Sequence, residues 1–325
     1  MLETAFVAAR DRARLTEIAA ILFRFGVDGL VKQLGLHKLI PHGEKRIEQD
    51  KEQYSLPERL RLALEALGPT YIKLGQILAT RHDLLSPQWT TELSKLHNHV
   101  TPLDWEVIHE QLCEDLGAQP EQVFAHFDRQ PLASASIAQV YKATLKGGQP
   151  VIVKVQRPQL QQTIDADLRL LSHLAQLLQD NSAQWARFKP VEIVEYLSRS
   201  MRLELDFNNE GRNCERIAAQ FADDPHIVIP GIYWQWSSER LLVQDFIQGW
   251  EPESSGYLRA QGLDPDLVAR RGAQAMLKMI LDEGEYHADP HPGNLLAMSG
   301  NRIGFIDFGL VGRLSTKRKN QLLVL

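Results

Sequence analysis

Two stretches in the last forty residues of the chain carry the strongest signal for its fold. They are His287-Ala-Asp-Pro-His-Pro-Gly-Asn294 (HADPHPGN) and Phe305-Ile-Asp-Phe-Gly309 (FIDFG). Taken alone, His287, Asp289 and His291 could form a metal site, because imidazole and carboxylate groups are good ligands for zinc or iron. The second stretch, close behind the first, favours a different kind of site.

In catalytic loops that transfer phosphoryl groups, an asparagine follows the catalytic aspartate by five residues, and a DFG sequence comes later. Asp289, Asn294 and Asp307 have this arrangement. In this interpretation Asp289 accepts or orients the proton of an acceptor hydroxyl, while Asn294 and Asp307 hold Mg²⁺ against the phosphates. The sequence therefore predicts a site for ATP or ADP with Mg²⁺.

A site of this kind also needs a lysine on a strand, to hold the phosphates, and a glutamate on the next helix to hold that lysine. Lys154 in "VIVKV" lies in a β-rich run and is the candidate lysine. A buried lysine without a partner would be costly, so a carboxylate must lie near it. The segment "RLELDFNNEGRN" offers Glu204, Asp206 and Glu210.

One expected element is missing. Where a glycine-rich loop should precede the strand lysine, the chain has Ala133, Ser134, Ala135, Ser136, Ile137 and Ala138. Each alanine adds a Cβ that keeps the backbone from approaching a phosphate as closely as glycine allows. We expect this segment to contact nucleotide differently from an ordinary kinase loop. The other candidate nucleotide contacts are Val140, Lys154, Gln244 and Phe246.

The residue pattern predicts an α+β fold in three consecutive domains, residues 1–130, 131–248 and 249–325. The first is an all-helical extension, because segments such as "LPERLRLALEALG" show helical spacing and no alternation. In the second, strands begin at Pro131 and flank a Gly147-Gly148 turn, and an extended helical insertion follows.

Long helices are predicted from about Leu160 to Gln179 and from Pro190 to Phe221, followed by a strand in "RLLVQDFIQG". The third domain begins with a helix from about Asp264 to Asp282, and a hairpin around Ser299-Gly300-Asn301 follows the predicted catalytic loop. Ser315 is the expected cap of a further helix.

The overall composition is that of a globular protein: 44% of the residues are hydrophobic, 24% are charged, and the formal net charge is −5. These values do not favour nucleic-acid binding. The segment "LTEIAAILFRFGVDGLVKQLGL", from Leu15, is interrupted by charges too often for a membrane span of about 20 apolar residues. This pattern predicts an amphipathic helix that packs on its own domain. The alternative is a helix that docks on a membrane surface or on a partner protein.

Taken together, these motifs resemble the UbiB/AarF family of atypical, protein-kinase-like ATPases, and its bacterial UbiB members most. The resemblance runs from about Leu56 to Gly312. Its diagnostic pieces are Lys73-Leu-Gly-Gln76, "PLASASIAQV", "VIVKVQRP", the E-x-D of Glu204 and Asp206, "HADPHPGN" and DFG. The K-x-G-Q segment combined with the alanine loop is not found in ordinary kinases, so the combination is highly specific.

The resemblance implies a two-lobe kinase-like fold, with residues 131–248 as the small lobe and residues 249–325 as part of the large lobe. It also implies that the K-x-G-Q helix, with Lys73 and Gln76, covers the pocket where a protein kinase receives its peptide. It implies that Lys73 faces Glu204 and Asp206, and that Glu210 pairs with Lys154. With the acceptor site covered, the expected chemistry is slow ATP hydrolysis or phosphorylation of a small molecule or lipid. Phosphorylation of proteins in trans is not expected.

The resemblance further implies a role in ubiquinone biosynthesis at the cytoplasmic side of the bacterial inner membrane. The expected partners are prenylated quinone precursors or lipids and other proteins of that pathway, with no nucleic acid. No transmembrane helix is expected within this sequence. Family members generally continue past the DFG region into membrane-spanning helices, so we expect the large lobe to be incomplete at Leu325.

Two rival interpretations remain at this level. Small-molecule phosphotransferases of the aminoglycoside or choline kinase type also carry an H-x-D-x-H-x-x-N loop, but they do not need the K-x-G-Q segment or the alanine loop. A catalytically inert scaffold that binds nucleotide and lipid would not need Lys154, Asp289, Asn294 and Asp307 as a set.

Overall fold

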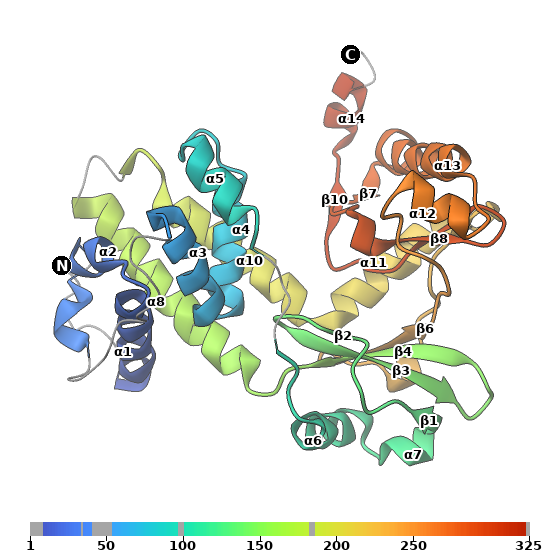
Figure 1. The fold of residues 1–325 in the computed structure, drawn as a ribbon, viewed down its shortest axis with the longest axis horizontal. Coiled ribbons are helices and arrows are strands. Elements are labelled where there is room, and N and C mark those ends of the chain that lie inside the picture. Colours follow the sequence, from blue (N-terminus) through green and yellow to red (C-terminus); the bar gives the residue numbers. More distant parts are fainter. Residues whose placement is uncertain (1–8, 34, 41–53, 97–100, 182–185, 323–325) are drawn as a thin grey trace. The chain divides into compact units, whose positions relative to one another are not determined.

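The computed structural model describes residues 9–33, 35–40, 54–96, 101–181 and 186–322 (Figure 1). The chain forms two compact units, each built from several segments. The helical unit takes its described residues from Met1–Thr101, Ala135–Ile137 and Pro158–Arg202, and the mixed unit from Pro102–Ser134, Ala138–Arg157 and Leu203–Leu325. The predicted division into three consecutive domains stays a prediction.

The helical unit is a set of packed helices. They are α1 (Ala9–Arg24), α2 (Asp28–Gln33), the short η1 (Leu36–Leu39), α3 (Leu56–Leu67), α4 (Pro69–Ala79), α5 (Pro87–Leu93), α8 (Leu160–Asn181) and most of α10 (Pro190–Leu205). Helix α3 begins where the sequence predicts, because Ser55 and Glu58 form a reciprocal capping box that satisfies two of the backbone N–H groups at its start.

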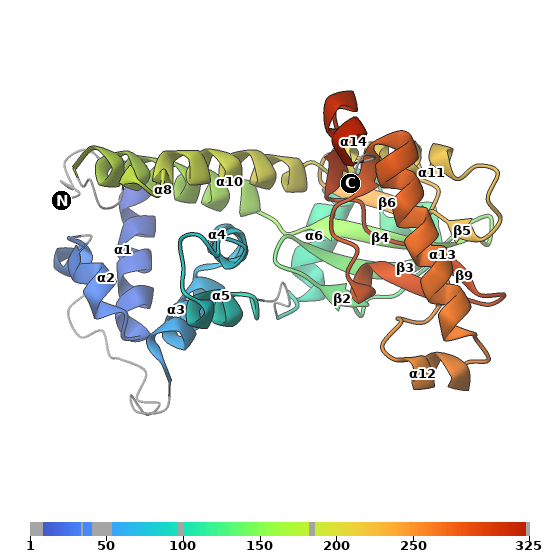
Figure 2. The same cartoon turned by 90° about the horizontal axis from the view of Figure 1, so that it is seen from above.

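The amphipathic segment that starts at Leu15 packs inside this unit. Leu15, Ile18 and Leu22 are buried, and α1 contacts α3 and α8 (Figure 2). Arg14 adds a buried ion pair across these helices, with its Nε donating to Asp167 at 2.7 Å. The packed-helix interpretation is therefore confirmed for α1, but the predicted single helix is not continuous: α1 ends at Arg24, and the chain turns at Gly26, with φ +70°, before α2. Within the described residues, no helix is long and apolar enough to cross a bilayer.

The mixed unit contains an antiparallel sheet. Its strands are β1 (Phe124–Phe127), β2 (Ala133–Ser134), β3 (Ala138–Leu145), β4 (Pro150–Gln156) and β6 (Leu241–Asp245), in the order β1-β3-β4-β6 with β2 beside β3. Helices α6 (Trp105–Leu116) and α7 (Pro120–Val123) precede the sheet in the chain. Ile108 of α6 shares a buried core with Tyr141 of β3 and Val153 of β4. The predicted β3–β4 hairpin is confirmed, with Gly148 at φ +87° in its turn.

The first strand begins at Phe124, earlier than the predicted start at Pro131. A register shift between Phe124 and His126 disrupts the pairing with β3. Phe124 and Phe127 lie three positions apart in the sequence, with this bulge between them, so the two-residue alternation that marks a strand in a sequence is absent.

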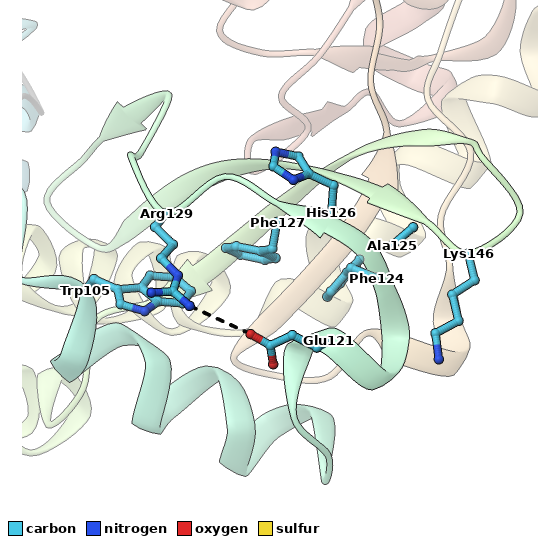
Figure 3. Close-up of a pocket in the computed structure, with 8 residues that line it drawn as sticks. All are labelled: Trp105, Glu121, Phe124, Ala125, His126, Phe127, Arg129 and Lys146. Carbon is cyan, nitrogen blue, oxygen red and sulfur yellow. Dashed lines mark ion pairs between the residues drawn. The ribbon is translucent and has the colours of Figure 1, made fainter.

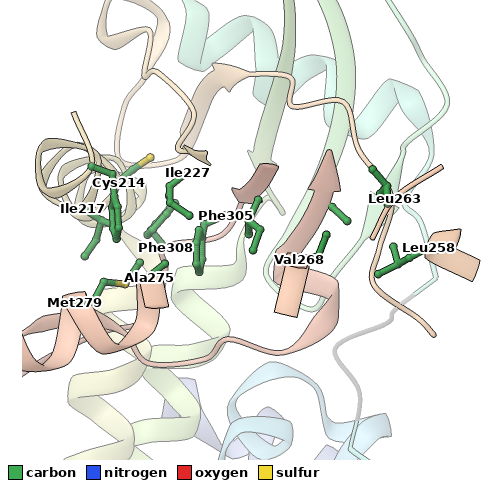
Figure 4. Close-up of a cluster of buried hydrophobic side chains, with 13 residues drawn as sticks. Cys214, Ile217, Ile227, Leu258, Leu263, Val268, Ala275, Met279, Phe305 and Phe308 are labelled. Carbon is green, nitrogen blue, oxygen red and sulfur yellow. The ribbon is translucent and has the colours of Figure 1, made fainter. Parts of the chain in front are cut away.

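The rest of the mixed unit surrounds a second core. Its elements are α11 (Phe207–Gln220), β5 (Ile227–Val228), η2 (Trp234–Trp236), α12 (Ser255–Ala260), α13 (Pro265–Leu277), η3 (Lys278–Glu283), β7 (Glu285–His287), η4 (Pro292–Asn294), β8 (Leu295–Met298), β9 (Arg302–Phe305), β10 (Val311–Arg313) and α14 (Thr316–Leu322). Side chains from α11, α13, η3 and β9 meet in one buried cluster around Phe305 and Phe308 (Figure 4).

Two other predicted helices also differ from the structure. The one predicted from Pro190 to Phe221 is broken at Asp206, whose extended backbone separates α10 from α11 and whose side chain accepts the Asn208 N–H to cap α11. The one predicted from Asp264 to Asp282 starts as expected behind the Asp264 cap, but its last part, η3, is a π-helix. The hairpin around Ser299-Gly300-Asn301 and the Ser315 cap are confirmed.

Candidate functional site

The strand register places Lys154 in the middle of the sheet. It lies on β4 between Val140 of β3 and Leu242 of β6. Its side chain is 13% exposed, and its Nζ donates to Glu210 Oε1 at 2.6 Å and to Asp307 Oδ2 at 3.4 Å. The structure thus brings together a strand lysine, a helix glutamate and the DFG aspartate from three distant parts of the sequence.

The three charged groups shift one another's pKa values to different extents. Burial alone would lower the pKa of Lys154, but the carboxylates of Asp307 and Glu210 outweigh it and raise that pKa above its ordinary value. Burial also opposes ionisation of Asp307, yet Lys154 and the Gly309 N–H lower its pKa. Burial raises the pKa of Glu210 in spite of Lys154. Asp307 is therefore the more firmly ionised of the two carboxylates.

The β8–β9 hairpin brings the catalytic loop to the DFG segment. Leu295 at the start of β8 pairs with Phe305 at the end of β9, so the residues just beyond this pair, Asn294 and Ile306, lie opposite each other. The Ile306 N–H donates to the Asn294 carbonyl at 3.1 Å. Asn294 and Asp307, which the sequence assigns to Mg²⁺, therefore sit next to each other at one end of the hairpin.

The side chains of these two residues present oxygen atoms of the kind that Mg²⁺ prefers. The Asn294 Nδ2 donates to the Asp289 carbonyl at 3.0 Å. This bond turns the amide nitrogen toward the loop, so the amide oxygen Oδ1 is the atom of Asn294 that could bind a cation. The Asp307 side chain is 43% exposed, and its Oδ1 accepts the Gly309 N–H at 2.9 Å. A carboxylate and an amide oxygen fit a magnesium ion better than zinc or iron.

The alternative zinc or iron site is not supported. Among the described residues, no group of three or more His, Cys, Asp or Glu side chains is arranged to hold a metal ion. His287 is buried, and its Nδ1 accepts the Asp289 N–H at 3.1 Å. The Nδ1 of His291 accepts the Gly293 N–H. The two imidazoles shape the backbone of the loop, and the carboxylate of Asp289 is exposed.

The alanine-rich segment folds back on β3. Ala133 pairs with Val140 and Ser134 with Gln139, and the Ser134 Oγ accepts a hydrogen bond from Arg157 Nη2 at 2.8 Å. Residues 133–138 are all described and none has a positive φ, so this segment does not use the backbone conformations that favour glycine. Ala135, Ser136 and Ile137 belong to the helical unit, and Ala138 begins β3.

Gln244 and Phe246 lie at the end of β6. Gln244 is buried, and its Nε2 donates to the Ile306 carbonyl at 3.3 Å, so this side chain ties the sheet to the segment before the DFG aspartate. Phe246 follows β6, and the Lys142 Nζ lies 4.2 Å from its ring centroid. Their predicted role as nucleotide contacts stays a prediction.

The K-x-G-Q segment lies on α4 in the helical unit. A Cβ on Gly75 would come within 2.2 Å of Leu96 Cδ1 and 3.0 Å of Leu64 Cδ1, so glycine is needed for close helix packing there. Gln76 Nε2 donates to the Leu96 carbonyl at 3.3 Å. Lys73 belongs to the helical unit, whereas Glu204 and Asp206 belong to the mixed unit, and their pairing with Lys73 stays a prediction.

Helix α11 supplies contacts that the sequence analysis missed. One turn beyond Glu210, the Asn213 Nδ2 donates to the Phe308 carbonyl at 2.9 Å. One turn further, Arg216 Nε bonds Glu285 Oε1 at 2.9 Å, and Arg313 Nε bonds the same carboxylate oxygen at 2.9 Å. The signal was present, since Glu210, Asn213 and Arg216 follow one another at the three-residue spacing that places side chains on one helix face.

A cavity of about 460 Å³ opens elsewhere in the mixed unit (Figure 3). It is lined by Trp105, Glu121, Phe124, Ala125, His126, Phe127, Arg129 and Lys146. The residues come from α6, α7, β1 and the loops after β1 and β3, and none of them belongs to the predicted site.

Comparison with known proteins accounts for this arrangement. Residues 95–325 match the family described as the ABC1 atypical kinase-like domain. A protein from Pseudomonas aeruginosa named "Probable protein kinase UbiB" is 36% identical over 321 residues, which cover 95% of this chain and 60% of that protein. The uncharacterised protein slr1919 of Synechocystis is 37% identical over 284 residues, covering 85% and 49%. This chain therefore spans about half to 60% of the length of these relatives.

A solved structure gives the same result for the fold. The complex of Rv3197 with erythromycin from Mycobacterium tuberculosis matches with a TM-score of 0.58 and 27% identity, over 77% of this chain and 63% of that one. The predicted α+β kinase-like fold with N-terminal helices is confirmed. The chain belongs to the UbiB/ABC1 family of atypical kinase-like proteins.

Proposed function

We propose that this chain binds ATP or ADP with Mg²⁺ at the Lys154–Glu210–Asp307 site and acts as an atypical kinase-like ATPase. The observation that carries the proposal is the contact of one lysine with both carboxylates, at 2.6 and 3.4 Å. A lysine held by a helix glutamate and placed beside a partly exposed aspartate fits the binding of phosphate groups and their cation. The mostly buried pair holds the lysine head group in one place.

Each residue of the site has a separate proposed role. Lys154 would hold the phosphates, with Glu210 fixing its position, while Asn294 and Asp307 would hold Mg²⁺, which supplies charge neutralisation of the phosphates when bound. Asp289 would orient the hydroxyl or water that receives the phosphoryl group. Its carboxylate is exposed, and its backbone is fixed by the His287 and Asn294 side chains. A preorganised loop of this kind holds a base in position for proton transfer.

The acceptor is proposed to be water, a small molecule or a lipid, with ubiquinone biosynthesis at the cytoplasmic face of the bacterial inner membrane as the setting. The UbiB relatives and the K-x-G-Q segment support this part of the proposal. Lys73 and Gln76 would cover the peptide site by pairing with Glu204 and Asp206, which disfavours protein phosphorylation in trans. Prenylated quinone precursors and other proteins of that pathway would be the partners.

Two measurements test the proposal. Magnesium with ADP should raise the melting temperature of the wild-type protein, and Asp307→Asn should remove most of that rise because it removes the charge that attracts the cation. ATP hydrolysis should depend on Asp289, so Asp289→Asn should lower kcat by about 100-fold or more and leave the thermal shift unchanged. A wild-type protein that gives no thermal shift with magnesium and ADP would refute nucleotide binding.

The same assays separate the rival interpretations. An inert scaffold would bind the nucleotide but show no turnover that depends on Asp289. A small-molecule phosphotransferase would turn over rapidly with a soluble alcohol and would not respond to Lys73→Ala. Under the proposed lid, Lys73→Ala uncovers the acceptor site and increases phosphorylation of the protein itself.

A further inference from the structure

We propose that Asn213 is a positioning residue that ties the DFG segment, and with it the carboxylate of Asp307, to the helix that holds Lys154. This inference rests on the proposed function for its catalytic meaning. Asn213 Nδ2 donates to the carbonyl of Phe308, the residue directly after Asp307, at 2.9 Å. Since Glu210 lies one turn earlier on α11 and bonds Lys154, one rigid helix fixes both halves of the site.

The Phe308 side chain is held in the same place as its carbonyl. It is 1% exposed and lies in the buried cluster with Cys214 and Ile217, which also come from α11 (Figure 4). The segment after Asp307 is therefore anchored to α11 twice, through an apolar contact and through the Asn213 hydrogen bond. On the other side, the Gly309 N–H bonds Asp307 Oδ1 at 2.9 Å.

The two anchors have different consequences for the carboxylate. The apolar contact is not directional, so it holds Phe308 in the core without fixing the peptide plane. The hydrogen bond from Asn213 is directional and fixes the orientation of the Phe308 carbonyl. It thereby also fixes the Gly309 N–H, which belongs to the same planar peptide group. Because this N–H holds Asp307 Oδ1, loss of the Asn213 bond should loosen Asp307 while the fold remains.

The next turns of α11 support this arrangement. Asn213 Oδ1 accepts a hydrogen bond from Arg216 Nη2, which fixes the amide so that Nδ2 points to the Phe308 carbonyl. Arg216 also bonds Glu285 at the start of the strand that leads into the catalytic loop. Helix α11 thus contacts the strand lysine, the DFG segment and the strand β7 that leads into the predicted catalytic loop.

Asn213→Asp tests the proposal most directly. The variant keeps an oxygen that can accept from Arg216, but it loses the N–H donor to the Phe308 carbonyl. Asn213→Ala is a second variant, because alanine suits a helix and removes both contacts. Arg212→Ala is the matched control: Arg212 is the neighbouring residue on α11, it is exposed, and its side chain makes no hydrogen bond to the described residues.

The first measurement is hydrogen exchange of the 306–310 segment in the protein without nucleotide. Both Asn213 variants should exchange about fivefold faster there than the wild type, as expected for the loss of one hydrogen bond, and Arg212→Ala should not. Equal exchange rates in wild type and in both Asn213 variants would overturn the proposal. Because no ligand is present, this result does not depend on whether the protein is an ATPase.

The second measurement is the magnesium concentration that gives half of the thermal stabilisation by ADP. It should rise about fivefold in Asn213→Asp, while stabilisation by ADP without magnesium changes less than twofold. A purely structural role for Asn213 would instead lower the melting temperature and leave the magnesium dependence as in the wild type. That outcome would contradict the positioning role even if nucleotide binding itself is demonstrated.

Discussion

The pairing of Lys154 with Glu210 can be tested by its effect on stability. Glu210→Gln keeps the size and the hydrogen-bonding oxygen of the side chain but removes its charge. The Lys154 and Glu210 side chains are only 13% and 8% exposed. Leaving one member of such a pair alone typically costs about 3–5 kcal/mol. Lys154 would still have Asp307 at 3.4 Å, so we expect a smaller loss of about 2 kcal/mol.

For a unit of this size, a loss of about 2 kcal/mol corresponds to a fall in melting temperature of about 4–8 °C. Lys154→Met should cost a similar amount, because it leaves Glu210 buried without its partner. The double variant Lys154→Met/Glu210→Gln leaves neither an unpaired lysine nor an unpaired buried glutamate. We therefore expect its loss to be smaller than the sum of the two single losses by about 1–2 kcal/mol.

The assay is denaturant unfolding of the two single variants, the double variant and the wild type at neutral pH. A parallel cycle with Lys142→Met in place of Lys154→Met is the control, because Lys142 lies on the neighbouring strand β3 and is exposed. That cycle should be additive. If the stability losses also add up in the Lys154 cycle, Lys154 and Glu210 do not couple. That result would contradict the ion pair between them.

Two further outcomes follow from the geometry. Gly75→Ala should destabilise the helical unit by about 1–3 kcal/mol in thermal unfolding, because the new Cβ would overlap Leu96. A second substitution, Leu96→Ala, should recover part of this loss. An unchanged melting temperature in the Gly75→Ala variant would contradict the close packing. Burial lowers the pKa of His287 below 6.5, so the unfolded chain binds more protons than the folded protein as the pH falls through 6.5. The free energy of unfolding should therefore decrease as the pH falls from 7 to 5, and the decrease should be smaller in the His287→Gln variant. The same pH dependence of stability in the wild type and in the variant would contradict this.

Much of the architecture could be predicted because local signals agree with the tertiary structure. The Gly147-Gly148 turn and the β-branched residues on both sides predict a hairpin, and the structure contains it. The failures occur where a local signal is hidden. The bulge in β1 spoils the alternation of Phe124 and Phe127, and the break at Asp206 falls inside a helical pattern that continues on both sides.

The candidate site shows the same division. Spacing in the sequence identified Asp289, Asn294 and Asp307, because a short loop and a hairpin fix their neighbourhood locally. For Lys154 the sequence offered three acidic candidates, and the resemblance to a family narrowed them to Glu210. Asn213 was missed, because its three-residue spacing from Glu210 does not show which group its side chain meets, and its partner is a backbone carbonyl far away in the sequence.

The sequence by itself determined the kinds of groups in this protein and the local elements that carry them: the strand lysine, the loop with its aspartate and asparagine, the DFG segment, and the alanines in place of glycines. These follow from turn chemistry and periodicity over a few residues. Only the tertiary structure decided which carboxylates meet Lys154 and what holds Asp307 in place. Those contacts join residues more than fifty positions apart. They form because the apolar faces of the sheet and the helices must pack together, and no short stretch of sequence contains that constraint.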